Sequence, residues 1–394
     1  MTSASQLVVP APPAGWTPQA AIAARFPQIA ELARVAGQEI RDLEAELDRR
    51  EAAGIGASCP RQILRELRWR LEYTANTEAM RAAIARLHSW AAAQCLDKDP
   101  NERCRAYTGV WFLQLDACID EMLADDFDGG AAPMQLLDRI NDPERLWEYL
   151  EGLIVSRLDD DGIDRRKELN LATANLVRLI LRQRPRSYNW NAGLEAVIRR
   201  FIAEWQDSAT GFFGADYFIG GRRFRTADLS LTFHMARYLE GAIGYWPQLI
   251  DTLLAMRDGR YPNGWLDEIG MTSHNNYDVA VLFRLGWPQM RPDQSRRAEE
   301  ELTRMLDWCL ASAIAPDGHI LARAIGESLP ESYYFTIAFL DTVGYFEPAK
   351  RLWATLDLPE RPALRARLEE RLAELPQRDP MVRMAQDRLR GPVS

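Results

Sequence analysis

The sequence predicts an all-α fold in which about six helix-pair repeats close into an (α/α)6 barrel, or toroid. Apolar residues recur at the 3.6-residue spacing of helices from about residue 18 to about residue 390, and runs typical of strands are nearly absent. A loop that carries Asp and Gly also returns along the chain, each time between two different kinds of helix. Together these observations favour a repeat architecture over a single irregular bundle.

The repeat is clearest in four loops, each of which precedes an apolar helix. Their anchoring aspartates are Asp159, Asp207, Asp258 and Asp317, separated by 48, 51 and 59 residues. Two weaker copies, beginning at Cys95 and at Glu51, extend the series toward the N-terminus. The pattern therefore predicts six units.

The two helices of each unit differ in their apolar pattern. First helices, such as residues 194–205, have one apolar stripe and a charged face, which is typical of a helix exposed on one side. Second helices, such as residues 228–239 and 278–287, are apolar on most faces, which is typical of a helix with neighbours all round. We therefore expect an inner and an outer ring. The prolines expected near outer-helix starts are Pro143, Pro247 and Pro292.

An open helical solenoid is the alternative to a closed ring. The terminal units of a solenoid are polar on their outer faces, and residues 62–73 are rather charged. In either case we expect one folded domain over residues 17–375. Residues 1–16 are expected to be a flexible segment, and residues 376–394 a polar tail.

Composition excludes several classes of function. The 394 residues include 48 Lys plus Arg and 57 Asp plus Glu, which gives a net charge of −9 and argues against binding to nucleic acid or to anionic membranes. The five cysteines form no C-x-x-C pair and have no histidine at metal-ligand spacing, so we expect no zinc site, no disulfide framework and no cofactor. The absence of a signal-peptide pattern and of a long apolar run predicts a cytoplasmic protein.

Chemically capable side chains concentrate in the fourth and fifth units. Three of the four histidines, His234, His274 and His319, lie in or beside the segments that precede three consecutive inner helices, so we expect them to converge on one rim. These segments are also rich in Gly and aromatic residues, which suits a concave site for a ring-shaped ligand. The remaining candidates are Asp216, Tyr217, Arg222, Arg225, Asp228, Trp265, Asp267, Asn275, Asn276 and Tyr277.

Several of these candidates also have a purely structural interpretation. Asp228 could cap the helix that follows it, and His234 could be a core histidine. Arg222 to Arg225 could form a solvated loop, Tyr217 could plug the core, and Asp159 to Asp161 could be an acidic turn rather than a metal site. A purely structural interpretation does not account for the segment from His274 to Asp278, because helix capping explains only one or two of its polar side chains.

A six-unit toroid with these loops resembles the carbohydrate-active (α/α)-barrel proteins, which include polysaccharide lyases, unsaturated uronyl hydrolases and sugar epimerases. The segment SHNNYDVAVLF is similar to a segment of the alginate lyase family, in which Asn-Asn-His-Gly is followed by Tyr-Asp and an apolar helix. His274, Tyr277 and Asp278 match in order. Ser273 and Asn275 depart from the family's pattern, and the spacing is one residue shorter.

The resemblance implies an enzyme, a lyase that acts on an acidic, uronate-containing oligosaccharide. His274 would be the base and Tyr277 the acid, with His234 and Asp228 beside them. Asn275 or Asn276, helped by one of the three arginines between residues 222 and 225, would bind the uronate carboxylate. The remaining substrate contacts would come from Asp216, Tyr217, Trp265, Asp267 and His319.

Other functions use the same residues differently. A glycoside hydrolase would pair Asp228 with Asp267 or Glu268, and an epimerase would use two of the three histidines. A terpenoid-cyclase-like toroid suits the apolar inner helices, but no Asp-rich motif continues after Asp161. A noncatalytic helical-repeat scaffold is the alternative that is not an enzyme.

Overall fold

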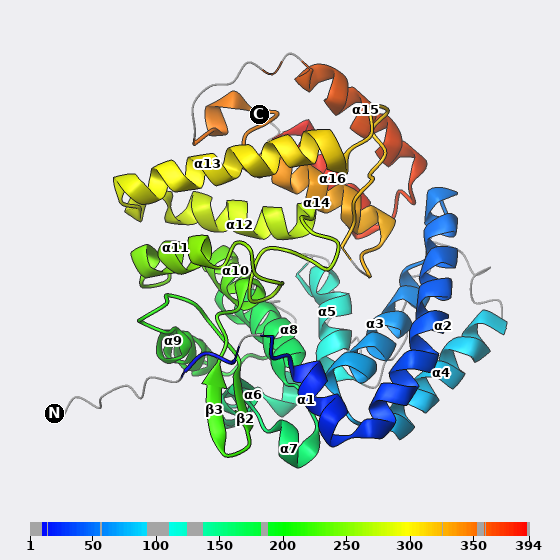
Figure 1. Cartoon of the computed structure of the whole chain (residues 1–394), viewed down its shortest axis with the longest axis vertical. Helices are drawn as coiled ribbons and strands as arrows, with labels where there is room; N and C mark the ends of the chain where they lie inside the picture. Colours follow the sequence, from blue (N-terminus) through cyan, green and yellow to red (C-terminus); the bar gives the residue numbers. More distant parts are fainter. Residues whose placement is uncertain are drawn as a thin grey trace.

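The computed structural model describes residues 10–13, 15–55, 57–92, 110–123, 137–182, 188–324, 326–352, 358 and 360–391. This part of the chain is mostly helical, as predicted, with three short strands (Figure 1). Within it, no helix is both long and apolar enough to cross a membrane.

One series of helices, here called the inner helices, packs in succession along the chain. They are α3 (Ser58–Tyr73), α5 (Trp111–Met122), α8 (Arg166–Val177), α10 (Leu229–Tyr238), α12 (Ser273–Gly286) and α14 (Leu329–Thr342). The outer helices are α2 (Pro27–Ala52), α4 (Thr77–Ala92), α6 (Pro143–Ile154), α9 (Leu194–Trp205), α11 (Trp246–Ala255), α13 (Pro292–Trp308) and α15 (Arg361–Glu374). The remaining helices are α1 (Pro18–Arg25), α7 (Leu158–Asp161) and α16 (Pro380–Arg390). In Figure 1, α9, α11, α13 and α15 follow one another around the left and upper edge, while α2 and α4 form the right edge.

The predicted difference between the two kinds of helix is confirmed for the best-described units. Helices α8, α12 and α14 bury residues on nearly every face, whereas α9 and α13 bury one stripe and expose the rest. Pro143 and Pro292 are the first residues of α6 and α13, and Pro247 is the second residue of α11. Proline costs little there because the first N–H groups of a helix have no partner within the helix.

The N-terminal helices contact the C-terminal units. α2 packs against α14. Arg323 Nη2 donates to Asp48 Oδ2 at 2.7 Å, and the backbone N–H of Leu329 donates to Glu51 Oε2 at 3.4 Å. The N-terminal helix α2 therefore contacts the last of the inner helices and the loop that precedes it. The weaker repeat loop that begins at Cys95 lies outside the described residues.

Two of the three strands occur where the sequence predicted only a loop, and the first lies near the end of a predicted first helix. β1 (Val155–Ser156) pairs in parallel with β2 (Asp216–Ile219), which pairs antiparallel with β3 (Arg222–Arg225). The β2–β3 turn is Gly220-Gly221, and both glycines have positive φ, the conformation that a two-residue hairpin requires.

Both predicted end segments contain ordered contacts. The carbonyl of Pro10 accepts from the N–H of Arg225, and the ring of Trp16 packs edge-on against Tyr217 with centroids 4.9 Å apart. The predicted polar tail contains α16, which packs against α14 and buries one apolar stripe. Residues 1–9, 14 and 392–394 lie outside the described residues.

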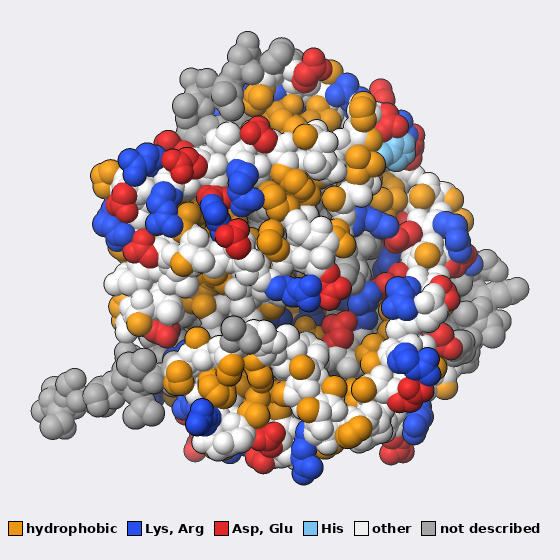
Figure 2. Space-filling view, in the orientation of Figure 1, with side chains coloured by type: hydrophobic (Ala, Val, Ile, Leu, Met, Phe, Trp, Pro, Cys, Tyr) orange, Lys and Arg blue, Asp and Glu red, His pale blue; other side chains and the backbone are white. Residues whose placement is uncertain are grey.

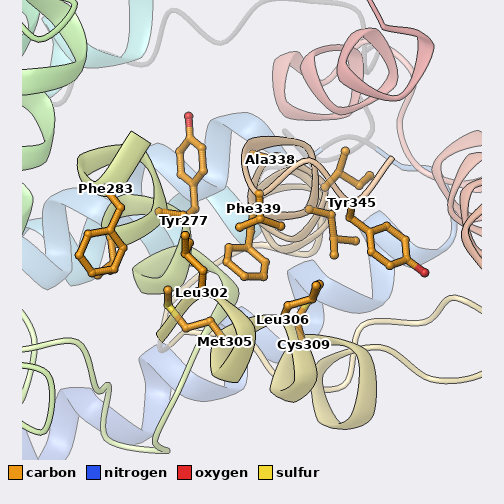
Figure 3. Packing of buried hydrophobic residues seen from close by; sticks show 14 of the residues in the cluster. Tyr277, Phe283, Leu302, Met305, Leu306, Cys309, Ala338, Phe339 and Tyr345 are labelled. Carbon is orange, nitrogen blue, oxygen red and sulfur yellow. The ribbon is translucent and has the colours of Figure 1, made fainter. Parts of the chain in front are cut away.

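The core lies between successive inner helices and their outer partners. One buried cluster extends from Phe212 to Leu389, a second from Ile22 to Met235, and a third joins α2, α3 and α4. Figure 3 shows part of the first cluster, in which the hydroxyl of Tyr277 points away from Leu302 and Met305. The ring of Tyr277 therefore packs in the core, whereas its hydroxyl points out of this cluster.

Candidate functional site

The candidate site is built around the first turns of α12. Thr272 caps this helix, since its Oγ1 accepts from the N–H of Asn275 at 3.3 Å. The side-chain Nδ2 of Asn275 donates to the carbonyl of Trp265 at 2.9 Å, which fastens the preceding loop to the helix. These two bonds fix the start of α12 and thereby the positions of His274 and Tyr277. The Nδ2 atom of Asn276 is buried and forms no hydrogen bond within the described part of the chain.

His274 is held by an aromatic ring and a carboxylate. Its imidazole stacks on Phe335 of α14 with centroids 3.8 Å apart and planes 7° from parallel. Its Nδ1 lies 3.5 Å from Glu327 Oε1. Burial lowers the pKa of His274, but Glu327, Asp278 and Glu331 together raise it above its ordinary value. The surroundings of His274 therefore favour the protonated imidazole more than water does.

Tyr277 and Tyr334 lie between two arginines. Arg388 Nη2 of α16 donates to the hydroxyl of Tyr277 at 3.2 Å, and Arg237 Nη2 of α10 contacts the hydroxyl of Tyr334 at 3.4 Å. The Arg388 guanidinium also lies over both rings, at 5.6 Å from Tyr277 and 5.7 Å from Tyr334. Asp341 accepts from Arg388 Nη1 at 2.9 Å and so fixes that arginine.

The two tyrosines have opposite pKa shifts. Burial raises the pKa of Tyr277, and the neighbouring Tyr334 raises it further against the charges of Arg237 and Arg388. Burial also raises the pKa of Tyr334, but the charges of Arg237 and Arg388 outweigh that effect and lower it. When two neighbouring groups have pKa values pushed apart, one is suited to act as an acid and the other as a base.

Arg237 has an unusual environment for an arginine. Its guanidinium lies over the rings of Phe233, Tyr238 and Tyr277 at 5.4 to 5.7 Å. No Asp or Glu of the described residues lies within ion-pair distance of it, in contrast to Arg388. A half-buried guanidinium normally has an anionic partner, so an anionic group of a ligand can form an ion pair with Arg237.

Two further titratable side chains, His234 of α10 and Asp278 of α12, also have shifted pKa values. Burial lowers the pKa of His234 to about 3, helped by the charges of Arg237, His274 and Lys167, and its buried Nδ1 has no hydrogen-bond partner in the described structure. Burial raises the pKa of Asp278 to about 7, and one of its oxygens likewise has no partner there. The charge of His274 is one of the smaller causes of the lowered pKa of His234.

Replacing Asp278 with asparagine is expected to stabilise the protein in a pH-dependent way. The pKa of Asp278 is about 7 in the fold, against an ordinary value near 4, so the folded state alone holds this proton between those values. The contribution of Asp278 to stability is therefore lost as the pH rises through about 7. Urea unfolding of Asp278→Asn should show a gain in stability that is larger at pH 8 than at pH 5, by on the order of 2 kcal/mol. The exposed Asp160→Asn should change neither value, and an equal gain from Asp278→Asn at both pH values would contradict the assignment.

A groove leads toward this region between the N-terminal helices and the loop before α14. Its volume is about 370 Å³, and it is lined by charged side chains of α2 and α3 and by the exposed apolar residues Ile269 and Leu321. Glu327, which contacts His274, is one of its lining residues. Figure 2 shows the molecule hollowed to the right of its centre, where Lys, Arg, Asp and Glu side chains gather. A second cavity of about 350 Å³ is lined by residues of α11, of the turn after it and of α13, without histidine or tyrosine.

Several predicted site residues belong to structural contacts instead. Asp228 is fully buried, pairs with Arg166 and caps α10 through the N–H of Leu231. Asp216 is also buried and accepts from Arg223 and Arg225 within the hairpin. The remaining members of this group are Arg222, which is exposed at the hairpin turn, and Tyr217, whose hydroxyl donates to buried Asp164 at 3.1 Å.

The other predicted substrate contacts do not meet at His274 either. Trp265 is buried in the core against Phe283, with centroids 6.0 Å apart. Asp267 lies in a turn with Gly270. His319 has a side chain that is 54% exposed and pairs with Asp317 at 2.9 Å in its own loop. His274 and Tyr277 both contact the ring of Phe335, and His234 and Tyr277 both contact the ring of Phe233. The ion pair of His319 lies within its own loop.

Sequence patterns could have pointed to some of the missed residues. The spacing of Val382, Ala385 and Leu389 predicts an amphipathic helix in the predicted tail, and Arg388 lies on this helix. Arg237 and Tyr334 lie inside helices whose apolar pattern indicated core, so their roles depend on which neighbours face them. No sequence signal distinguishes these two residues from packing residues.

The described residues contain no group of three or more His, Cys, Asp or Glu side chains that could hold a metal ion. Comparisons of the chain with protein families, with curated proteins and with solved structures find no match.

Proposed function

We propose that the protein is a carbohydrate-active enzyme that acts on acidic, uronate-containing oligosaccharides, and that it is a lyase. The observation that carries the proposal is Arg237, a guanidinium enclosed by aromatic rings, with no carboxylate partner among the described residues, and beside two tyrosine hydroxyls of opposite pKa shift. A uronate carboxylate is the complementary ligand for such a cation.

The closed (α/α)6 toroid is part of the same proposal. It is supported by the unbroken succession of contacts from α3 to α14 and by the contact of α2 with α14. In this architecture, residues on α10, α12, α14 and α16 face a common interior. The groove beside Glu327 then provides the route by which a chain-like substrate enters.

The proposed reaction is an elimination next to the uronate carboxylate. A base removes the proton on the carbon that bears the carboxylate, and the electron pair left behind forms a carbon–carbon double bond. The bond to the glycosidic oxygen on the adjacent carbon breaks, and an acid protonates that oxygen. Atoms and electrons balance without an oxidant or a second substrate.

Each step has a suitable side chain. Arg237 binds the carboxylate and stabilises the negative charge that develops on it. Tyr334 is the base, because the two arginines lower its pKa, and Tyr277 is the acid, because it keeps its proton. His274, which the sequence suggested as the base, is better suited to donate a hydrogen bond to the substrate, because its raised pKa favours the protonated ring.

Incubation with uronate oligomers tests this function. A lyase generates the ultraviolet absorbance of a double bond conjugated to a carboxylate, together with one new chain end per double bond. New reducing ends without that absorbance would indicate a hydrolase instead. No change in any uronate oligomer, combined with specific capture of a protein partner, would favour the scaffold.

An epimerase is the second candidate, because His234 and His274 have opposite pKa shifts. One neutral and one protonated imidazole on the two sides of a sugar carbon could remove a proton and return it to the other face. Such an enzyme would change the uronate composition of the oligomer and would exchange the abstracted proton with solvent. It would produce neither a double bond nor a new chain end.

A further inference from the structure

The C-terminal helix α16 reaches the tyrosine pair through one side chain, Arg388. Its Nη2 donates to the hydroxyl of Tyr277 at 3.2 Å, and its guanidinium lies over the rings of Tyr277 and Tyr334 at 5.6 and 5.7 Å. The two tyrosine rings are neighbours, with centroids 6.3 Å apart. One cation therefore faces both of the side chains that would move a proton in the proposed reaction.

The direction of the Arg388 hydrogen bond leaves the proton of Tyr277 available. A guanidinium has donors only, so the oxygen of Tyr277 accepts this bond. A phenol carries a single hydrogen, and that hydrogen cannot point at another donor. It is therefore directed away from Arg388, as an acid that protonates a leaving oxygen requires.

Asp341 of α14 holds Arg388 in this place. Its Oδ2 accepts from Arg388 Nη1 at 2.9 Å, and its Oδ1 accepts from Lys350 Nζ, also at 2.9 Å. In the described part of the chain no hydrogen bond joins Asp341 to either tyrosine. Asp341 is therefore bonded to Arg388 and to neither of the reacting hydroxyls.

Arg237 and Arg388 differ in what they leave for a ligand. Arg388 is already paired with Asp341, whereas no Asp or Glu of the described residues lies within ion-pair distance of Arg237. A guanidinium that is paired with a carboxylate does not need a second anion. We therefore expect the substrate carboxylate at Arg237 and a different task for Arg388.

We propose that Arg388 is a catalytic residue that stabilises the negative charge passing between Tyr334 and Tyr277, and that Asp341 is its positioning residue. This proposal rests on the proposed function and deepens it. Before the reaction the charge is on Tyr334, the deprotonated base. Tyr334 then takes the proton from carbon and Tyr277 gives its own proton to the glycosidic oxygen. The charge is left on the Tyr277 oxygen, to which Arg388 donates.

The tyrosine pair can restore itself after each reaction. Tyr334 is then protonated and Tyr277 is a phenolate, and one proton transfer from Tyr334 to Tyr277 returns both to their starting states. No proton is gained or lost over the cycle, and no further reactant is needed. Because Arg388 lies over both rings, its charge compensates the negative charge in either position.

Arg388→Met tests the catalytic assignment. We expect kcat for a galacturonate trimer to fall by about 10²-fold or more, because a preorganised donor to the developing charge is removed. The Kd of the trimer, titrated calorimetrically in a Tyr334→Phe background that prevents turnover, should stay within a few-fold of its value with Arg388 present. Arg388→Lys should restore only part of kcat, because an ammonium group lacks the planar fork that bonds to Asp341 and Tyr277 together. The matched control is Arg390→Met, which removes an exposed charge from the same helix and should change neither value.

Asp341→Ala tests the positioning role. Its kcat should fall about as far as that of Arg388→Met, and the double variant should lose no more than Arg388→Met alone, because both changes remove one interaction. The control is Lys350→Met, which removes the other partner of Asp341 and should leave kcat within a few-fold of wild type. Additive losses in the double variant would overturn the positioning role.

The pH profile separates positioning from a purely structural role. Burial raises the pKa of Tyr334, but the charges of Arg237 and Arg388 outweigh burial and lower it, as does the neighbouring Tyr277. Losing Arg388, or releasing it in Asp341→Ala, should raise that pKa and move the alkaline rise in rate to higher pH. An unchanged profile in Arg388→Met would overturn the catalytic assignment. A shift to lower pH in Asp341→Ala would mean that Arg388 keeps its place without Asp341, and would overturn the positioning role.

Failure of this proposal is distinguishable from failure of the proposed function. In the ligand-free protein, ultraviolet titration of tyrosine with and without Tyr334→Phe reports the ionisation of Tyr334. If Arg388→Met moves that ionisation to higher pH while wild-type protein neither binds nor cleaves a uronate oligomer, the charge pairing stands and the lyase assignment fails. If Arg388→Met cleaves uronate oligomers with the kcat of wild type, the lyase assignment stands and this proposal fails.

Discussion

Replacing Tyr334 with phenylalanine is expected to lower kcat/KM for a uronate oligomer by about 10²-fold or more, because the base of the elimination is removed while its ring remains. Tyr277→Phe should have a loss of similar size through the missing acid. In the wild-type enzyme the rate should rise with pH toward the pKa of Tyr334, which lies below the ordinary tyrosine value. That alkaline rise should disappear from the residual activity of Tyr334→Phe.

Tyr333→Phe is the matched control for these variants. Tyr333 is the neighbour of Tyr334 on α14 and is equally buried, but it contacts neither Arg237 nor Arg388. Loss of the Tyr333 hydroxyl should leave kcat/KM within a few-fold of wild type.

His274→Ala should reduce activity while leaving the melting temperature nearly unchanged. A collapse of the melting temperature in both His274→Ala and Tyr277→Phe would show that these residues are structural.

Replacing Asp228 with alanine is expected to destabilise the protein by about 3–5 kcal/mol, the range found when one partner of a buried ion pair is removed. The reason is that Arg166 would keep a buried charge without its partner, and α10 would also lose its cap at Leu231. Asp228→Asn should cost less, because the amide oxygen can still cap the helix.

Denaturant unfolding measures the stability of both variants, and a variant that breaks an exposed ion pair is the control. Glu195→Ala removes the partner of Arg199 on the outer face of α9 and should change stability by less than about 1 kcal/mol. A loss of under about 1 kcal/mol in Asp228→Ala would instead mean that water reaches the Arg166 pair. Asp228 would then regain the catalytic role that the sequence suggested for it.

The helix pattern was predictable because it depends on local periodicity. The spacing of apolar residues within one helix predicts which of its faces are buried. This spacing predicted single apolar stripes on α9 and α13 and nearly continuous apolar surfaces on α12 and α14. His274 and Tyr277 were also identifiable, because polar residues at the start of an apolar helix need more than a capping role.

The partners of those residues were not predictable, because contacts between distant elements decide them. Arg225 and Arg237 are both arginines near aromatic residues, yet Arg225 is neutralised by Asp216 across a hairpin and Arg237 has no carboxylate partner among the described residues. The sequence around Asp228 suggested an active-site acid, but Arg166, 62 residues away along the chain, donates a hydrogen bond to it. Such differences depend on which helices become neighbours.

The most direct test of the proposed site compares how the protein binds a galacturonate trimer and the same trimer with its carboxylates methyl-esterified. In a Tyr334→Phe background the acidic trimer should bind at least about 10-fold more tightly than the ester, and Arg237→Met should abolish that preference without unfolding the protein. Equal binding of the acidic and esterified trimers, or an unchanged preference in Arg237→Met, would contradict the assignment of Arg237 as the carboxylate-binding residue beside the tyrosine pair.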